Sequence, residues 1–62
     1  MKTHHFLFEC VDEESECFGE EFIVGAYTYT EAREIAEDNF GKCRFWHELS
    51  EEEAEMSGLD EY

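Results

Sequence analysis

The chain has 62 residues, of which 18 are Asp or Glu and four are Lys or Arg, so its formal net charge is −14. So short a chain forms a single domain, expected here over residues 1–62, and its charge argues against direct binding to DNA or RNA. It contains no run of about 20 apolar residues that would span a membrane, and no secretory signal is recognisable, so we expect a cytoplasmic protein without membrane contact.

Two strands are predicted in the N-terminal half. Residues 3–11 carry apolar side chains on both faces, which is typical of a central strand. Residues 12–19 are mostly polar and are expected to form a loop. Residues 21–29 are rich in β-branched and aromatic residues, and Gly25 within them indicates a bulge or a close approach of another segment.

A helix and a third strand follow. Thr28 or Thr30 is expected to cap a helix over residues 31–40, whose narrow apolar stripe contains two Ala residues. Residues 42–49 are predicted to form the third strand. Its expected apolar face comprises Cys43, Phe45, His47 and Leu49.

The remaining residues are predicted to form a short second helix. Ser50 and Glu53 have the spacing of a capping box, the helix is expected to end near Ser57, and residues 58–62 are expected to fray. A right-handed crossover over the first strand gives the order 2-1-3. The predicted fold is therefore α+β with the layout ββαβ(α). It has a three-stranded antiparallel sheet, one helix packed on a face, and a short C-terminal helix.

The cysteine and histidine residues give only a weak indication of a metal site. The candidate zinc ligands are Cys10, Cys17, Cys43 and His47. Their separations lack the short paired spacing of structural zinc sites, and the acidic run at residues 12–16 lacks the register of a calcium-binding loop. There is no catalytic or phosphate-binding motif, and so small a chain is poorly suited to enclose a substrate pocket. We therefore expect no enzymatic activity and no cofactor.

The acidic residues are the strongest functional indication. Nearly all lie in three blocks, at residues 12–21, 31–38 and 48–61. Carboxylates on a rigid scaffold can imitate the phosphates of DNA, which predicts a non-enzymatic inhibitor or modulator that occupies the basic site of a nucleic-acid-binding protein. The expected contact residues are Glu13, Glu14, Glu16, Glu51, Glu52, Glu53 and Glu55, with Trp46 or Tyr62 as anchors.

Two Glu-containing helix openings, at residues 30–36 and 50–55, occur in this short acidic chain. Together with its length and charge, they resemble small acidic accessory proteins of bacteriophages and mobile elements. That group includes anti-restriction and anti-CRISPR DNA mimics. The resemblance implies an inhibitor role and assigns no functional residue.

Two other functions remain open. In one, the chain is a small structural or regulatory homodimer whose aromatic sheet face is the interface and whose acidity serves only solubility. The expected self-association residues are Leu7, Tyr27, Tyr29 and Trp46. The last helix and Leu59 could instead fold back over that face within one molecule. In the other function, the Cys and His residues make the chain a metal-responsive module.

Overall fold

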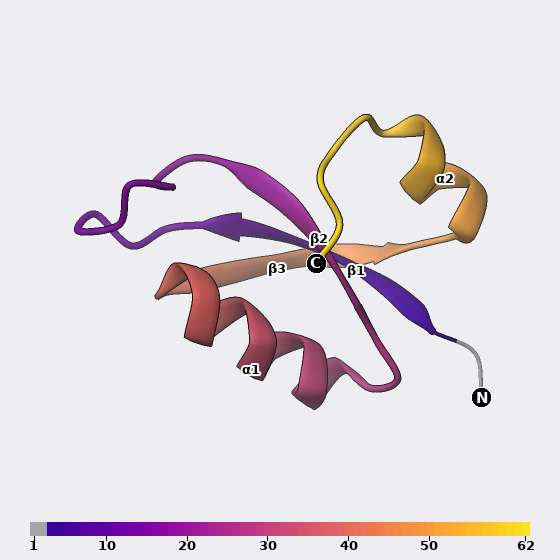
Figure 1. Cartoon of the computed structure of the whole chain (residues 1–62), viewed down its shortest axis with the longest axis horizontal. Helices are drawn as coiled ribbons and strands as arrows, with labels where there is room; N and C mark the ends of the chain where they lie inside the picture. Colours follow the sequence, from indigo (N-terminus) through magenta and orange to yellow (C-terminus); the bar gives the residue numbers. More distant parts are fainter. Residues whose placement is uncertain (1–2) are drawn as a thin grey trace.

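The computed structural model describes residues 3–62, so the first two residues of the predicted domain lie outside the described part. The elements are β1 (His4–Cys10), β2 (Glu21–Ala26), α1 (Tyr29–Phe40), β3 (Cys43–Leu49) and α2 (Glu51–Met56) (Figure 1). The strands form one antiparallel sheet in the order β2-β1-β3. The predicted α+β fold and its strand order are confirmed. Within residues 3–62, no helix is both long enough and apolar enough to cross a membrane.

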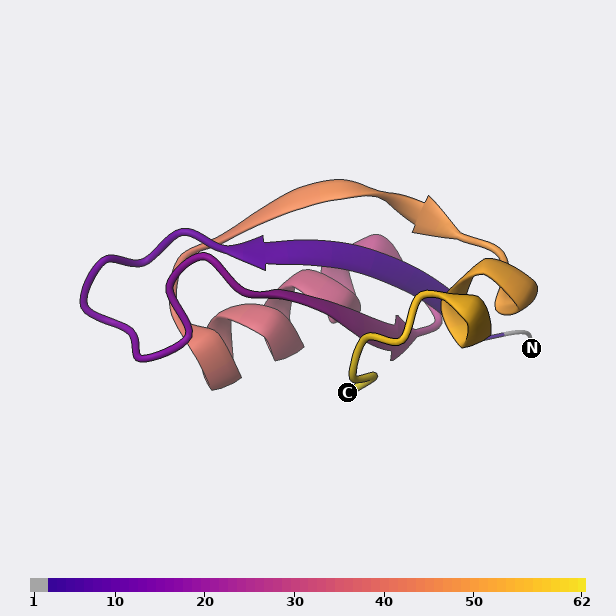
Figure 2. The same cartoon turned by 90° about the horizontal axis from the view of Figure 1, so that it is seen from above.

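The main core lies between the sheet and α1, which runs along one face of the strands (Figure 2). Ala32 and Ala36 of α1 are fully buried, and their small side chains allow the helix backbone to lie close to the sheet. The buried strand residues of this core are Phe6, Phe8, Cys10, Phe22, Val24 and Ala26. Large aromatic side chains from the strands thus pack against the small side chains of the helix.

The junction between β2 and α1 explains why β2 is shorter than predicted. Thr28 is the N-cap of α1, and its hydroxyl accepts a hydrogen bond of 3.1 Å from the backbone N–H of Glu31. Thr28 has the extended backbone of an N-cap, so the helix begins at Tyr29. The pairing of β2 with β1 ends at Ala26, which is opposite His4. The Tyr29 ring then contacts Phe45 of β3, with ring centroids 5.0 Å apart.

A β-bulge in β3 was not predicted. Leu7 is paired with His47 but Phe8 with Phe45, so Trp46 is the extra residue on β3. Because side chains alternate between the faces of a strand, one extra residue reverses the alternation. Phe45 therefore faces α1, whereas His47 and Leu49 face the opposite side. The sequence predicted one shared face for Cys43, Phe45, His47 and Leu49. This prediction is wrong for His47 and Leu49, which follow the bulge.

Gly25 is a site of close approach and has a regular partner in β1. A Cβ atom at this position would lie 3.3 Å from Thr3 Cγ2 and 3.6 Å from the Glu61 carboxylate. The C-terminal segment therefore runs directly beside β2. Of the two interpretations of Gly25, the close approach is confirmed.

The C-terminal segment pairs with β2, so the prediction that residues 58–62 fray is wrong. The N–H of Ile23 donates to the Asp60 carbonyl at 2.9 Å, and the N–H of Tyr62 donates to the Ile23 carbonyl at 2.7 Å. The N–H of Gly25 donates to the Tyr62 carbonyl at 2.8 Å. These bonds place the segment parallel to β2 along its outer edge, and they satisfy backbone groups that an edge strand leaves unpaired.

Asp12 joins the loop after β1 to the turn after α1. Its carboxylate accepts hydrogen bonds from the N–H of Glu14 at 3.0 Å and from the N–H of Lys42 at 3.3 Å. Gly41 lies against this carboxylate with φ +87° and ψ −142°, a region that is essentially restricted to glycine. The two connections are thereby fixed to each other at one end of the sheet.

We expect Gly41→Ala to destabilise the fold by about 1 to 3 kcal/mol or more, because the added methyl group is strained and also collides with Asp12. Gly19→Ala is the control, since Gly19 has φ +84° but a Cβ atom added there would meet nothing within 4 Å. Urea denaturation of both variants checks the prediction. The interpretation is contradicted if Gly19→Ala costs as much as Gly41→Ala.

Candidate partner-binding surface

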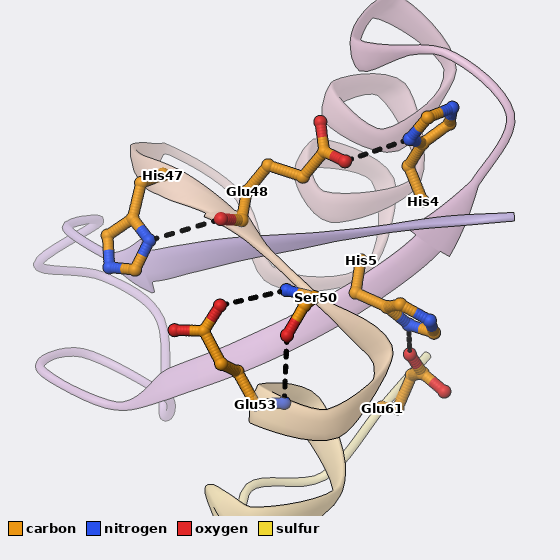
Figure 3. A network of polar contacts seen from close by, with 7 residues as sticks. All are labelled: His4, His5, His47, Glu48, Ser50, Glu53 and Glu61. Carbon is orange, nitrogen blue, oxygen red and sulfur yellow. Dashed lines mark hydrogen bonds and ion pairs between the residues drawn. The ribbon is translucent and has the colours of Figure 1, made fainter.

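α2 presents four closely spaced carboxylates, at residues 51, 52, 53 and 55. The Ser50 hydroxyl accepts from the N–H of Glu53 at 3.1 Å, and the Glu53 carboxylate accepts from the N–H of Ser50 at 3.2 Å, which completes the predicted capping box (Figure 3). These backbone and hydroxyl contacts of Ser50 lower the pKa of Glu53. Glu51 and Glu52 complete the acidic first turn and are exposed. The helix therefore begins in a fixed position with its carboxylates directed to solvent.

Three histidines lie on β1 and β3, and two of them pair with carboxylates (Figure 3). His4 Nδ1 lies 2.8 Å from Glu48 Oε2, and His5 Nδ1 contacts the Glu61 carboxylate. His47 Nδ1 lies 3.3 Å from the Glu48 carbonyl oxygen. A neutral imidazole can donate a hydrogen bond to a carboxylate without cancelling its charge. These contacts therefore orient the carboxylates of Glu48 and Glu61. A neutral histidine leaves the negative charge of its partner in place.

The acidic residues predicted to contact a partner do not form one patch. Glu13, Glu14 and Glu16 are exposed on the acidic loop (residues 11–20), which lies at one end of the molecule. α2 lies towards the opposite end (Figure 1). The longest dimension of the Cα trace is 34 Å. A partner that contacts both groups must therefore follow the length of the molecule.

The acidic residues of α1 were left out of the predicted contact set. Their side chains are exposed on the outer surface of the helix, while Ala32 and Ala36 face the sheet. These residues are Glu31, Glu34, Glu37 and Asp38. The acidic block at residues 31–38 was itself the signal that could have identified them. Together the three blocks place carboxylates at both ends and along one helix.

Very little of this charge is neutralised within the molecule. In the part of the chain that the structure describes, Arg33–Glu37 is the one ion pair between a carboxylate and an Arg or Lys, at 3.7 Å. Arg44 instead lies over the Trp46 ring, 4.7 Å from its centroid. No charged side chain is buried among residues 3–62. The carboxylates are thus available to an external cation.

The two predicted anchors differ in their surroundings. Trp46 stands at the bulge, is 45% exposed, and contacts Arg44. The Tyr62 ring packs edge-on against Phe40 and Phe22, with centroid distances of 4.9 and 5.9 Å. Trp46 therefore offers an accessible aromatic surface, whereas Tyr62 also covers the margin of the core.

The structure separates the residues predicted to mediate self-association. Tyr29 packs on the α1 face, Tyr27 lies in the turn before α1, and Leu7 points to the opposite face. On that opposite face α2 and Leu59 fold back over the sheet. They leave an open apolar groove of about 450 Å³, lined mainly by Leu7, His47, Leu49, Met56 and Leu59. The face is therefore partly covered within one molecule.

The four candidate metal ligands do not converge. Cys10 and Cys43 face α1, and Cys17 packs against the same core. His47 lies on the other face because the bulge reverses the alternation of β3. Among residues 3–62 there is no group of three or more His, Cys, Asp or Glu side chains that could hold a metal ion. The same separation places His47 out of reach of Cys43 as a catalytic base.

The capping box provides a test of the local geometry of α2. We expect carboxyl NMR to show the pKa of Glu53 below its ordinary value of about 4.3 in the wild type. In Ser50→Ala the pKa should rise only part of the way towards that value, because this variant removes the hydroxyl contact and keeps the backbone N–H at residue 50. Because the folded-state pKa is lowered, the stabilising contribution is present above the ordinary pKa and is lost as the pH falls through the lowered one. An unchanged Glu53 titration in Ser50→Ala would contradict the contribution assigned to the Ser50 hydroxyl.

Comparison with known proteins identifies no relative of this chain. It matches no protein-family model, no curated protein and no solved structure.

Proposed function

We propose that the protein is a non-enzymatic inhibitor or modulator whose acidic surface occupies the basic site of a nucleic-acid-binding protein. The observation that carries this proposal is the unneutralised charge. All 18 carboxylates belong to residues 3–62, none of them is buried, and one forms an ion pair with an Arg. A net charge of about 2 to 8 is sufficient for the solubility of a small domain, so a charge of −14 exceeds that need.

The dimensions of the molecule support a comparison with duplex DNA. Its 18 carboxylates are distributed along 34 Å, about one per 1.9 Å, while duplex DNA carries one charge per ~1.7 Å of its axis. The basic residues reduce the net density below that of DNA. A length of 34 Å is also about one helical turn of a duplex. A basic groove that accommodates one turn of DNA would therefore meet carboxylates at both ends of this protein.

The placement of the apolar residues favours the same interpretation. Most large apolar side chains are used in the two layers around the sheet, and the acidic side chains occupy the loop, the outer surface of α1, and α2. Binding to a basic cleft would then be steered by long-range electrostatic attraction. Trp46, which is 45% exposed, can add a short-range aromatic contact. The resemblance of the sequence to phage-encoded DNA mimics is in accord with this proposal.

The alternative of a homodimer through an aromatic sheet face has less support. Two of its expected residues, Tyr29 and Leu7, lie on opposite faces of the sheet, and α2 covers part of the Leu7 face. Salt separates the two functions, because an interface between opposite charges weakens with ionic strength while an aromatic interface responds little.

The first test is a pull-down from lysate at low and high salt, followed by mass spectrometry. We expect the recovered partner to be a nucleic-acid-binding protein, released by a duplex oligonucleotide of about one turn. Its affinity should fall about tenfold or more when the salt is raised from about 50 to 200 mM. Recovery of no nucleic-acid-binding protein would contradict the proposal.

The second test changes the charge of α2 without removing its cap. In the variant Glu51→Gln, Glu52→Gln, Glu53→Gln, the Gln at the third position can still complete a capping box. We expect about a tenfold or greater loss of affinity for the recovered partner, because three charges are removed from one end of the surface. Arg33→Gln is the control, because it removes a positive charge and so makes the protein more acidic. This variant should preserve or strengthen binding. Equal binding by the triple variant and the wild type would exclude a contact role for α2.

A further inference from the structure

Cys10 and Cys43 lie directly opposite each other on neighbouring antiparallel strands. The N–H of Cys10 donates to the Glu20 carbonyl, and its carbonyl accepts from Gly19, so both of its peptide groups face away from β3. The next residue, Val11, donates to Lys42 on the β3 side at 2.8 Å. The two cysteines are therefore a non-hydrogen-bonded pair, the type in which the Cα atoms are closest, about 4.5 Å apart. That separation is within the range found for disulfide bonds, about 4.4 to 6.8 Å.

The two thiols also point to the same place. Cys10 Sγ donates to the Phe40 carbonyl at 3.4 Å, and Cys43 Sγ lies 3.3 Å from the Gly41 carbonyl. Cys43 Sγ is also 3.7 Å from the Ala36 carbonyl. Both sulfur atoms thus lie beneath the last turn of α1. A bond between the two sulfurs would replace these weak contacts with the carbonyl groups.

We propose that Cys10 and Cys43 are a redox modification site that forms a cross-strand disulfide with a low-molecular-weight disulfide as the oxidant. The thiolate of Cys43, the more accessible of the two, attacks one sulfur of the oxidant and releases one thiolate. The Cys10 thiolate then attacks the Cys43 sulfur of this mixed disulfide and releases the second thiolate. The protein loses two electrons and two protons, and the oxidant is reduced to two thiols.

This bond would act on the acidic loop. Cys10 is the last residue of β1 before the loop, and Cys43 is the first residue of β3 after the turn that contacts Asp12. Oxidation therefore adds a covalent link beside the hydrogen bonds that already hold the base of the loop. Cys17, within the loop, has no partner left in the three-cysteine chain. The oxidised state would present the loop carboxylates with less freedom of movement.

The reaction should depend strongly on pH. Burial raises the pKa of the Cys43 thiol to about 11, and the neighbouring Cys10 acts in the same direction. Since the thiolate is the nucleophile, the rate of oxidation should increase up to about tenfold per pH unit below this value. The pair is thus slow to react while it is covered by α1, and faster when the pH is raised.

The test is incubation of the reduced full chain with oxidised glutathione at several pH values, followed by non-reducing peptide mapping. Cys10 and Cys17 have no Lys or Arg between them, so cleavage after Glu is needed to separate them. We expect a linked pair of peptides that contain Cys10 and Cys43, with the mass of two hydrogens lost. The urea midpoint of the oxidised chain should increase, because the bond closes a long loop.

Cys17→Ser is the matched control and should form the same linked peptides at a similar rate. Cys43→Ser should abolish the linkage, and circular dichroism checks that this variant retains its fold. The proposal is overturned if the Cys17→Ser chain forms no intramolecular disulfide at any pH. It is also overturned if Cys17 is the main partner of either cysteine in the wild type. Neither result bears on binding to a basic partner, which is measured with the reduced chain.

Discussion

β1 carries apolar side chains on both of its faces, so both faces must be buried. The bulge at Trp46 allows the neighbouring strand β3 to contribute apolar side chains to the layer beneath α1 and to the layer beneath α2. Before the bulge, β3 directs Phe45 towards α1, and after it β3 directs Leu49 towards α2. If β3 alternated regularly through Trp46, Leu49 would point to the α1 side and the α2 side would lose one of its buried residues. One local irregularity thus lets a chain of 62 residues form two apolar layers.

This division of the apolar residues determines where the charge can lie. With both faces of the sheet engaged, the carboxylates occupy the loop at one end, the outer surface of α1, and α2 at the other end. Repulsion between them is limited by their separation and opposes the compact state less than a single cluster would. The same arrangement gives the molecule its extended acidic character, so the proposed function depends on the way the sheet is covered.

The fold was largely predictable from local patterns. The apolar residues on both sides of β1 indicated a central strand, and Thr28 and Ser50 marked the starts of the two helices. The bulge was not predictable, because a continuous alternation of residues gives no sign of an unpaired position. The pairing of the C-terminal segment was missed for a related reason. Its bonds join backbone groups, and the acidic side chains of Asp60 and Glu61 carry no apolar signal.

The candidate surface was predictable in composition but not in shape, since the spacing of Glu residues along the chain does not reveal that the loop and α2 lie at opposite ends (Figure 1).

The C-terminal segment also protects one edge of the sheet. Along β2 it pairs with the N–H and carbonyl of Ile23 and the N–H of Gly25, which would otherwise be open to a second molecule. The other edge strand, β3, is irregular at Trp46, follows Lys42 and contains Arg44. Sheets with such margins resist strand-by-strand growth into aggregates, so this aromatic-rich chain should remain dispersed even when salt screens its repulsion.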